Sequence, residues 1–159
     1  MTYRLLVIGY GNELRHDDAV GPLAARAVSD WQAPGVKALA VQQLTPELVD
    51  VMAHADTVVF VDAGHVANET VCSRLLKPIH RPLPLGHLGD PCELLALAEM
   101  IYHRRPEAWL ITVPAPNLEF GEGLSVMAER GLAAALERIS FLAGPRRVGL
   151  PDQARPFTA

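Results

Sequence analysis

Short runs of apolar residues that end at a glycine or an aspartate recur along the chain. Leu5 to Ile8 is such a run and ends at Gly9, and TVVFVDAG at 57–64 is another, containing Asp62 near its end. Short apolar runs without polar alternation are typical of strands that are buried on both faces of a sheet. Such strands occur mainly in parallel sheets, because helices then cover both faces. The runs therefore favour a fold built around a buried parallel sheet.

Segments with helical spacing alternate with these runs, which predicts an α/β domain whose largely parallel sheet lies between helical layers. We expect the domain to span residues 1–143 and the proline-containing segment 144–159 to be a flexible tail. In such sheets, ligands bind outside the carboxyl ends of the strands. The expected strands are 5–8, 36–41, 57–64, a weaker 69–76 and 109–113; the expected helices run from near Ala19, from the N-cap Thr45 to about 54, from Pro91 to about 103, and from 125 to 142.

Composition excludes several classes of protein. The net charge of −4 offers no basic surface for nucleic acid. No segment approaches the roughly 20 apolar residues that span a bilayer, and the N-terminus does not resemble a signal peptide. The two cysteines, Cys72 and Cys92, fit neither a disulfide scaffold nor a C-x-x-C site, and we expect both to be buried. These features predict a soluble, cytoplasmic protein.

The loop GYGNELRHDDAVG at 9–21 resembles a dinucleotide-binding turn only in part. Gly9 and Gly11 are present, but Leu14 occupies the place of the third glycine in G-x-G-x-x-G. The adjacent carboxylates of Asp17 and Asp18 would repel a phosphate. The G-K-[ST] of a P-loop and the G-x-S-x-G of a serine hydrolase do not occur. The sequence therefore argues against a nucleotide site at this turn.

Acidic residues follow two of the expected strands. Asp17 and Asp18 come after the first strand, and Asp62 ends the third. Carboxylates at strand ends bind divalent cations, and histidine is the commonest nitrogen ligand. His16 and His65 are close in sequence to these acids, but no H-E-x-x-H occurs. The residues alone predict a metal or polar site at the carboxyl edge, with helix capping by Asp17 or Asp18 as the alternative for the acidic pair.

Three motifs, in order, resemble the nickel–iron hydrogenase maturation endopeptidases. The first is the G-x-G-N turn with its acidic pair, and the second is VVFVDAG with Asp62. The third begins at GHLGDPCELLALAEM, with His87, and ends in a glutamate- and glycine-containing loop before Leu124 and Ser125. The resemblance covers residues 4 to 142. The chain departs from the family in having Asp18 where some members have glutamate, and Leu-Gly before His87.

The resemblance implies a three-layer α/β/α sandwich with a mostly parallel or mixed sheet of about five strands. It also implies that Asp18, Asp62 and His87 bind a metal and form the catalytic site, with Gly11, Asn12 and Asp17 as second shell or substrate cleft. The implied activity is removal of the C-terminal extension of a hydrogenase large-subunit precursor after nickel insertion. The divalent metal would be the precursor's nickel, without an organic cofactor, and the protein would act as a monomer.

A second hypothesis of a different class remains open. A non-catalytic metallochaperone or docking module would use the same carboxylates to bind the hydrogenase large subunit without cutting it. The two hypotheses differ in the fate of the precursor, because only the endopeptidase shortens its C-terminus.

Overall fold

The computed structural model describes residues 2–65, 69–80 and 89–144. Its centre is a five-stranded sheet in the order β2-β1-β3-β5-β4. The strands β2, β1, β3 and β5 are parallel, and β4 pairs with β5 in the antiparallel sense. The predicted mostly parallel or mixed sheet is thus confirmed. The strands are β1 (Tyr3–Tyr10), β2 (Val36–Val41), β3 (Ala55–Gly64), β4 (Cys72–Leu76) and β5 (Glu107–Pro114).

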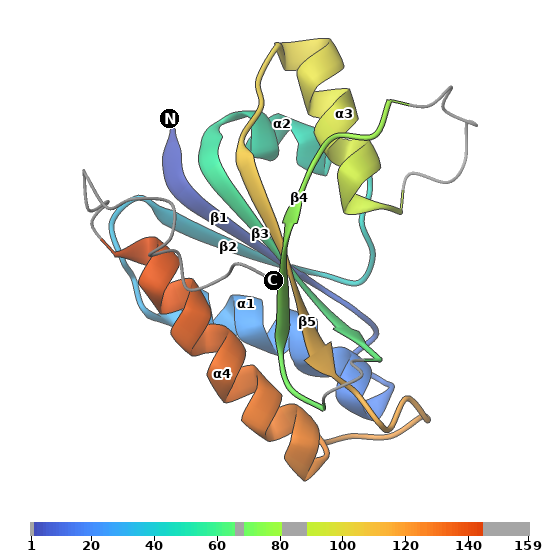
Figure 1. Cartoon of the computed structure of the whole chain (residues 1–159). Helices are drawn as coiled ribbons and strands as arrows, with labels where there is room; N and C mark the ends of the chain where they lie inside the picture. The colour runs from blue at the N-terminus through green and yellow to red at the C-terminus, as the bar shows by residue number, and fades with distance from the viewer. Residues whose placement is uncertain (1, 66–68, 81–88, 145–159) are drawn as a thin grey trace.

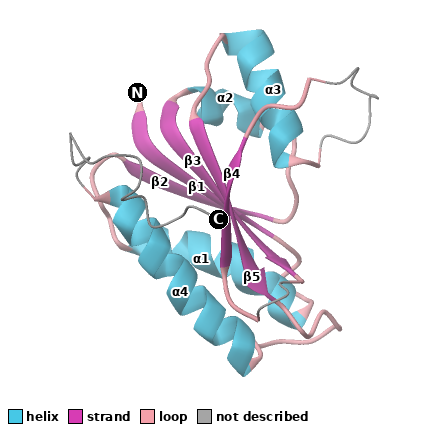
Figure 2. Ribbon diagram, viewed as in Figure 1, coloured by secondary structure: helices cyan, strands magenta, loops and turns pink. Residues whose placement is uncertain are grey.

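Helices cover both faces of this sheet, which gives three layers (Figure 1). The helices α1 and α4 lie on one face, and α2 and α3 lie on the other (Figure 2). None of the helices among the described residues is long and apolar enough to cross a membrane. The helices are the short 3-10 helix η1 (His16–Ala19), α1 (Val20–Asp30), α2 (Leu48–Ala53), α3 (Pro91–Tyr102) and α4 (Val126–Ala143).

The alternation of side chains along each strand divides the core into two halves. On β1, Leu5 and Val7 pack with α1 and α4, whereas Leu6 and Ile8 pack with α2 and α3. All four side chains are fully buried. Because successive residues of a strand point to opposite faces, a strand covered on both sides needs apolar residues throughout. The apolar run at 5–8 is therefore correctly predicted to be a strand buried on both faces.

Several local predictions are wrong. Helix α2 begins at Leu48 and not at Pro46, so Thr45 is not its N-cap. The carboxylates of the acidic pair do not cap α1, whose N-cap is Ala19 with no side-chain bond to the helix. Cys92 is buried as expected, but Cys72 is exposed on the edge strand β4. The predicted tail lies, apart from Gly144, outside the described residues.

Two glycines allow β1 and α1 to touch. A Cβ atom on Gly9 would overlap the carbonyl group of Gly21, and one on Gly21 would overlap the carbonyl oxygen of Tyr10. Both neighbours are backbone atoms, which cannot move away without shifting the helix or the strand. Helix α1 follows directly from η1, so this contact also sets where the acidic pair lies at the sheet edge.

We expect Gly9→Ala to lower the free energy of unfolding by about 1–3 kcal/mol or more, because the added methyl group forces α1 away from β1. Urea unfolding of the two proteins measures the difference. Gly89→Ala is the matched control, since no atom of the described residues lies within 4 Å of a Cβ at Gly89. Equal losses in the two variants would contradict the close contact.

Candidate functional site

The order of the strands defines a candidate binding edge by topology alone, between the carboxyl ends of β1 and β3. The chain leaves β1 for β2 on one side and later returns to β3 on the other side, with α1 and α2 on opposite faces of the sheet. Ligands of open α/β sheets bind at such a switch point. Tyr10 ends β1 here, and Asp62 lies near the end of β3.

Asp18 reaches this edge from η1, and the turn after β1 holds its carboxylate. The backbone N–H of Asn12 donates to Oδ2 of Asp18 at 2.6 Å. Gly11 has a φ of +151°, and a Cβ there would overlap the backbone carbonyl of Asp18. The glycine is thus needed for both its conformation and its close contact with η1. The G-Y-G-N turn is therefore a cradle for a carboxylate, not for a phosphate.

Asp62 points from β3 towards the α2 and α3 side of the sheet. It follows Val58 and Phe60 in alternation, and both of those side chains belong to the core under α2 and α3. The pKa of Asp62 is raised to about 6, mainly by burial and to a smaller extent by the negative charge of Asp18. Hydrogen bonds from the Tyr10 hydroxyl and the Ala63 N–H act in the opposite direction. Asp62 is thus a partly desolvated carboxyl group within electrostatic reach of a second one.

Tyr10 is a residue of the site that sequence reasoning missed. In the parallel register Gly9 lies opposite Val61, so Tyr10 and Asp62 are neighbours on the same face of the sheet. Burial, followed by the charge of Asp62, raises the pKa of the Tyr10 phenol. The alternation of side chains could have revealed this neighbour. Tyr10 lies on the same face of β1 as Leu6 and Ile8, and Asp62 lies on the same face of β3 as Phe60.

The two carboxylates suit a cation chemically. Two nearby negative charges repel each other, and a divalent ion between them would offset both this repulsion and the cost of desolvation. Among the described residues, no group of three histidine, cysteine, aspartate or glutamate side chains has the geometry to hold a metal ion. The predicted third ligand, His87, lies outside the described residues. The structure thus brings Asp18 and Asp62 to one edge, and the complete set of three stays a prediction.

The other histidines near the acids do not join them. Nδ1 of His16 forms a hydrogen bond with the backbone carbonyl of Gly123 at 3.0 Å, so this ring belongs to the loop contact described below. His65 follows β3 and is exposed.

Asp17 is fully buried and binds a distant loop. Its Oδ2 accepts from the N–H of Asn117 at 2.9 Å and from the Ser125 hydroxyl at 2.8 Å, and its Oδ1 accepts from the Ser125 N–H at 2.6 Å. The same hydroxyl accepts from Ala128 N–H and caps α4. Asp17 therefore joins the segment beside Asp18 to the start of α4.

Asn12 contributes to the site mainly through its backbone. Its side-chain oxygen accepts from the N–H of Leu14 at 3.0 Å, which closes the turn after β1, while its own N–H binds Asp18. The side chain thus shapes the turn that holds the carboxylate.

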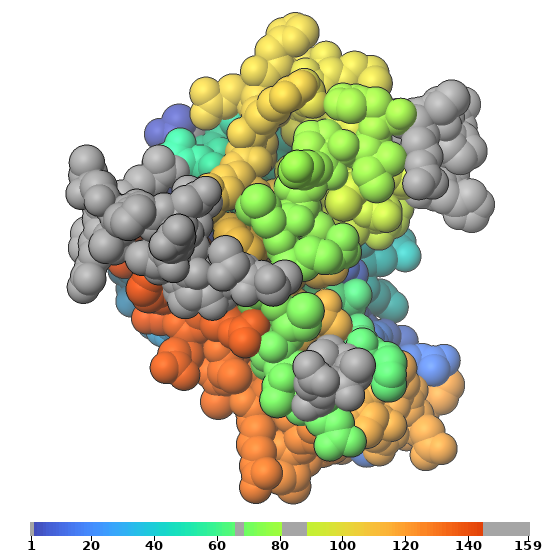
Figure 3. All heavy atoms as spheres, viewed as in Figure 1, coloured from blue at the N-terminus to red at the C-terminus, as the bar shows by residue number. Residues whose placement is uncertain are grey.

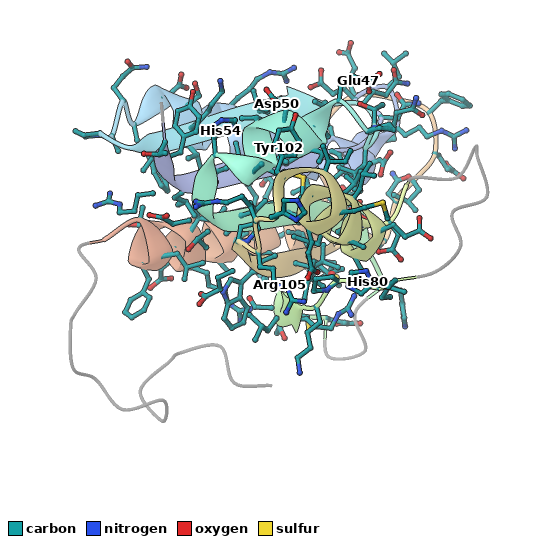
Figure 4. All side chains as sticks on the ribbon, turned by 90° about the horizontal axis from the view of Figure 1, so that it is seen from above. Glu47, Asp50, His54, His80, Tyr102 and Arg105 are labelled. Atoms are coloured by element: carbon teal, nitrogen blue, oxygen red, sulfur yellow. The ribbon has the colours of Figure 1, made fainter. Side chains whose placement is uncertain are left out.

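A second polar group lies away from this edge, on the surface of α2 and α3. Figure 4 shows Asp50, His54 and Tyr102 together there. The Tyr102 hydroxyl donates to Asp50 at 2.9 Å, and the rings of His54 and Tyr102 meet edge to face. These contacts tie α2 to α3 and leave the edge between β1 and β3 as the candidate site.

Comparison with known proteins identifies the fold. No protein-family profile matches the sequence, and no curated protein matches it. Among solved structures, the chain is similar to the nickel–iron hydrogenase maturation protease HycI from Thermococcus kodakarensis, with 23% identity over 88% of this chain and 92% of that one and a TM-score of 0.68.

Two further structures agree with this likeness. The hydrogenase maturating endopeptidase HybD from E. coli is 24% identical over 86% of this chain and 89% of its own, with a TM-score of 0.66. The maturation protease HybD from Thermococcus kodakarensis is 23% identical over 89% and 99% of the two chains, also with a TM-score of 0.66. The resemblance noted in the sequence is confirmed in three dimensions: the chain has the fold of the nickel–iron hydrogenase maturation proteases.

Proposed function

We propose that this protein is an endopeptidase that removes the C-terminal extension of a nickel–iron hydrogenase large-subunit precursor after nickel insertion. The observation that best supports the proposal is the meeting of Asp18 and Asp62 at the switch point between β1 and β3. The structures of similar fold are named as maturation proteases of hydrogenases. In this proposal the protein acts in the cytoplasm, as a monomer.

The metal of the site belongs to the substrate in this proposal. Asp18, Asp62 and His87 would contact the nickel of the precursor, with two oxygen ligands and one nitrogen ligand. Such a set suits a borderline divalent ion and leaves coordination positions for groups of the precursor and for water. Because the two carboxylates repel each other when no cation is present, the site favours a precursor that already contains nickel. Processing would then follow metal insertion for an electrostatic reason.

The surrounding residues would hold this geometry. The N–H of Asn12 fixes one oxygen of Asp18, and the hydroxyl of Tyr10 donates to Asp62. Ligands held by such hydrogen bonds lose less conformational freedom when they bind a metal. The nickel would place the nearby peptide bond of the precursor at the site, which makes positioning a main contribution of these side chains.

Co-expression with a nickel-loaded precursor tests the function. We expect mass spectrometry to show a shortened large subunit with the wild-type protein and an uncut one with Asp18→Ala. Asp56→Ala is the matched control, because Asp56 is an exposed aspartate at the opposite end of β3 and its loss should leave cleavage intact. Cleavage by Asp18→Ala would refute the site. A stable complex of the wild-type protein with an uncut, nickel-loaded precursor would favour the docking module instead.

A further inference from the structure

The loop after β1 and the loop between β5 and α4 form one joined segment beside the candidate site. The N–H of Gly121 donates to the carbonyl of Leu14 at 2.8 Å, and the N–H of His16 donates to the carbonyl of Gly121 at 2.9 Å. Arg15 and Gly121 form an isolated parallel bridge. Two loops about a hundred residues apart in the chain are thus paired through their backbones.

Side-chain contacts also hold the two loops together. The buried carboxylate of Asp17 accepts hydrogen bonds from Asn117 and Ser125. Nη1 of Arg15 donates to the carbonyl of Leu118 at 3.3 Å, and its guanidinium lies 4.1 Å from the centre of the Phe120 ring. In Figure 3 the blue atoms of the early chain and the orange atoms of the later loop meet at the lower right. These contacts therefore hold the two loops in one fixed arrangement.

The two joined loops expose three large apolar side chains to water. Leu14 is 66% exposed, Leu118 46% and Phe120 71%. We call these three residues the apolar platform. Together they expose on the order of a few hundred Å² of apolar surface, a size at which exposed patches on proteins are often functional. Exposure of this kind costs free energy, and a loop held in place by many hydrogen bonds cannot turn the side chains inward.

The position of the apolar platform relates it to the candidate site. Leu14 stands four residues before Asp18, in the turn that holds the Asp18 carboxylate. Leu118 and Phe120 belong to the loop that Asp17, the neighbour of Asp18, binds. The apolar platform therefore lies on the two loops that flank the segment carrying Asp18.

We infer that the apolar platform binds the polypeptide segment of the precursor next to the cleaved bond, through at least one apolar side chain of that segment. This inference rests on the proposed function. Glu119 and Glu122 are exposed at the loop and Arg15 lies over the Phe120 ring, so charges of both signs border the platform and its apolar side chains provide the contact. The platform is also smaller than the roughly 800 Å² per partner of a stable dimer interface, so one extended segment fits it better than a second copy of the chain.

Steady-state cleavage of the nickel-loaded precursor tests the platform. For Leu14→Asp and for Phe120→Asp we expect KM to rise about tenfold to a hundredfold, with kcat unchanged, because these side chains bind the ground state and the transition state alike. Met100→Asp is the matched control, since Met100 is 59% exposed on α3, away from this edge, and should leave KM within about twofold. Thermal unfolding confirms that the variants remain folded, and Leu14→Asp serves alone if Phe120→Asp loosens the loop through Arg15.

The outcomes separate this inference from the proposed function. If the wild-type protein binds the precursor without cutting it, and binding weakens in Leu14→Asp but not in Met100→Asp, the platform stands and the endopeptidase proposal fails. Equal kinetics in all variants would overturn the platform. So would a wild-type dimer, seen by light scattering, that Leu14→Asp converts to a monomer, because a second copy would then be the occupant.

Discussion

Replacing Asp62 by asparagine is expected to abolish cleavage of the precursor and, at neutral pH, to raise the free energy of unfolding. The amide keeps the shape of the carboxyl group but loses the negative charge that would contact the precursor's nickel. It also removes a charge that is costly in the folded protein, because burial and the charge of Asp18 both disfavour the ionised form of Asp62. Cleavage assays should show a loss of about a thousandfold, the upper range for groups that stabilise charge in a reaction.

The gain in stability of Asp62→Asn over the wild-type protein should increase with pH. The pKa of Asp62 is about 6 in the folded protein and 3.8 as its ordinary value, so between these values the folded state binds more protons than the unfolded state. Below about pH 4, Asp62 is protonated in the folded protein and does not destabilise it. As the pH rises through 6, Asp62 loses its proton in its buried position, and the free energy of unfolding falls. Asp62→Asn should melt at a higher temperature than the wild-type protein at pH 7.5, and the difference should shrink towards pH 4.

Thermal unfolding of the two metal-free proteins between pH 4 and pH 8 measures this effect. Asp56→Asn, an exposed aspartate on the same strand, is the matched control and should show no such dependence. A difference in melting temperature between Asp62→Asn and the wild-type protein that is the same at pH 4 and pH 8 would contradict the raised pKa. A residue that lowers stability at neutral pH while it supports activity is expected at a functional site.

The sequence was sufficient to predict where the carboxylates meet. In a parallel sheet every carboxyl end lies at the same edge, so acids that follow two strands are brought together whatever the details of the loops. Asp18 follows β1 and Asp62 lies near the end of β3, and these two strands are neighbours in the sheet. The apolar runs and the three-layer fold were predictable for a similar reason, because burial on both faces leaves a pattern along the chain.

The partner of Asp17 could not be predicted in this way. A carboxylate next to a helix start fits a cap, and local sequence does not distinguish a cap from a bond to a residue 100 or 108 positions away. Ser125 was expected as the beginning of the last helix and as part of the third motif, and neither pointed to a bond with Asp17. The position of Tyr10 was closer to being predictable, since it needed only the register of two strands. Contacts between regular strands could thus be predicted from the sequence, whereas contacts between loops could not.

Asp17→Ala is expected to cause the largest loss of stability of any change discussed above, about 3–5 kcal/mol. The substitution leaves the partly buried N–H groups of Asn117 and Ser125 without the acceptor that the fully buried Asp17 side chain supplies. Each unsatisfied buried donor costs about 1–3 kcal/mol, and bonds to a carboxylate are stronger than bonds between neutral groups. For a domain whose total stability is about 5–15 kcal/mol, the loss is a large share of the whole.

Chemical denaturation measures the loss, with Asp30→Ala at the exposed end of α1 as a control that should stay within about 0.5 kcal/mol of the wild-type protein. If Asp17→Ala does not fold, Ser125→Ala gives a milder test: it removes one bond to Asp17 and the cap of α4, at a cost of about 1–2 kcal/mol. In both variants, hydrogen exchange should become faster at the backbone N–H groups of Asn117 and Gly121, because the loop that carries the apolar platform is then held by fewer bonds. Unchanged exchange there, or an Asp17→Ala variant within about 1 kcal/mol of the wild-type protein, would show that the two loops are held together by Arg15 and the backbone bridge instead.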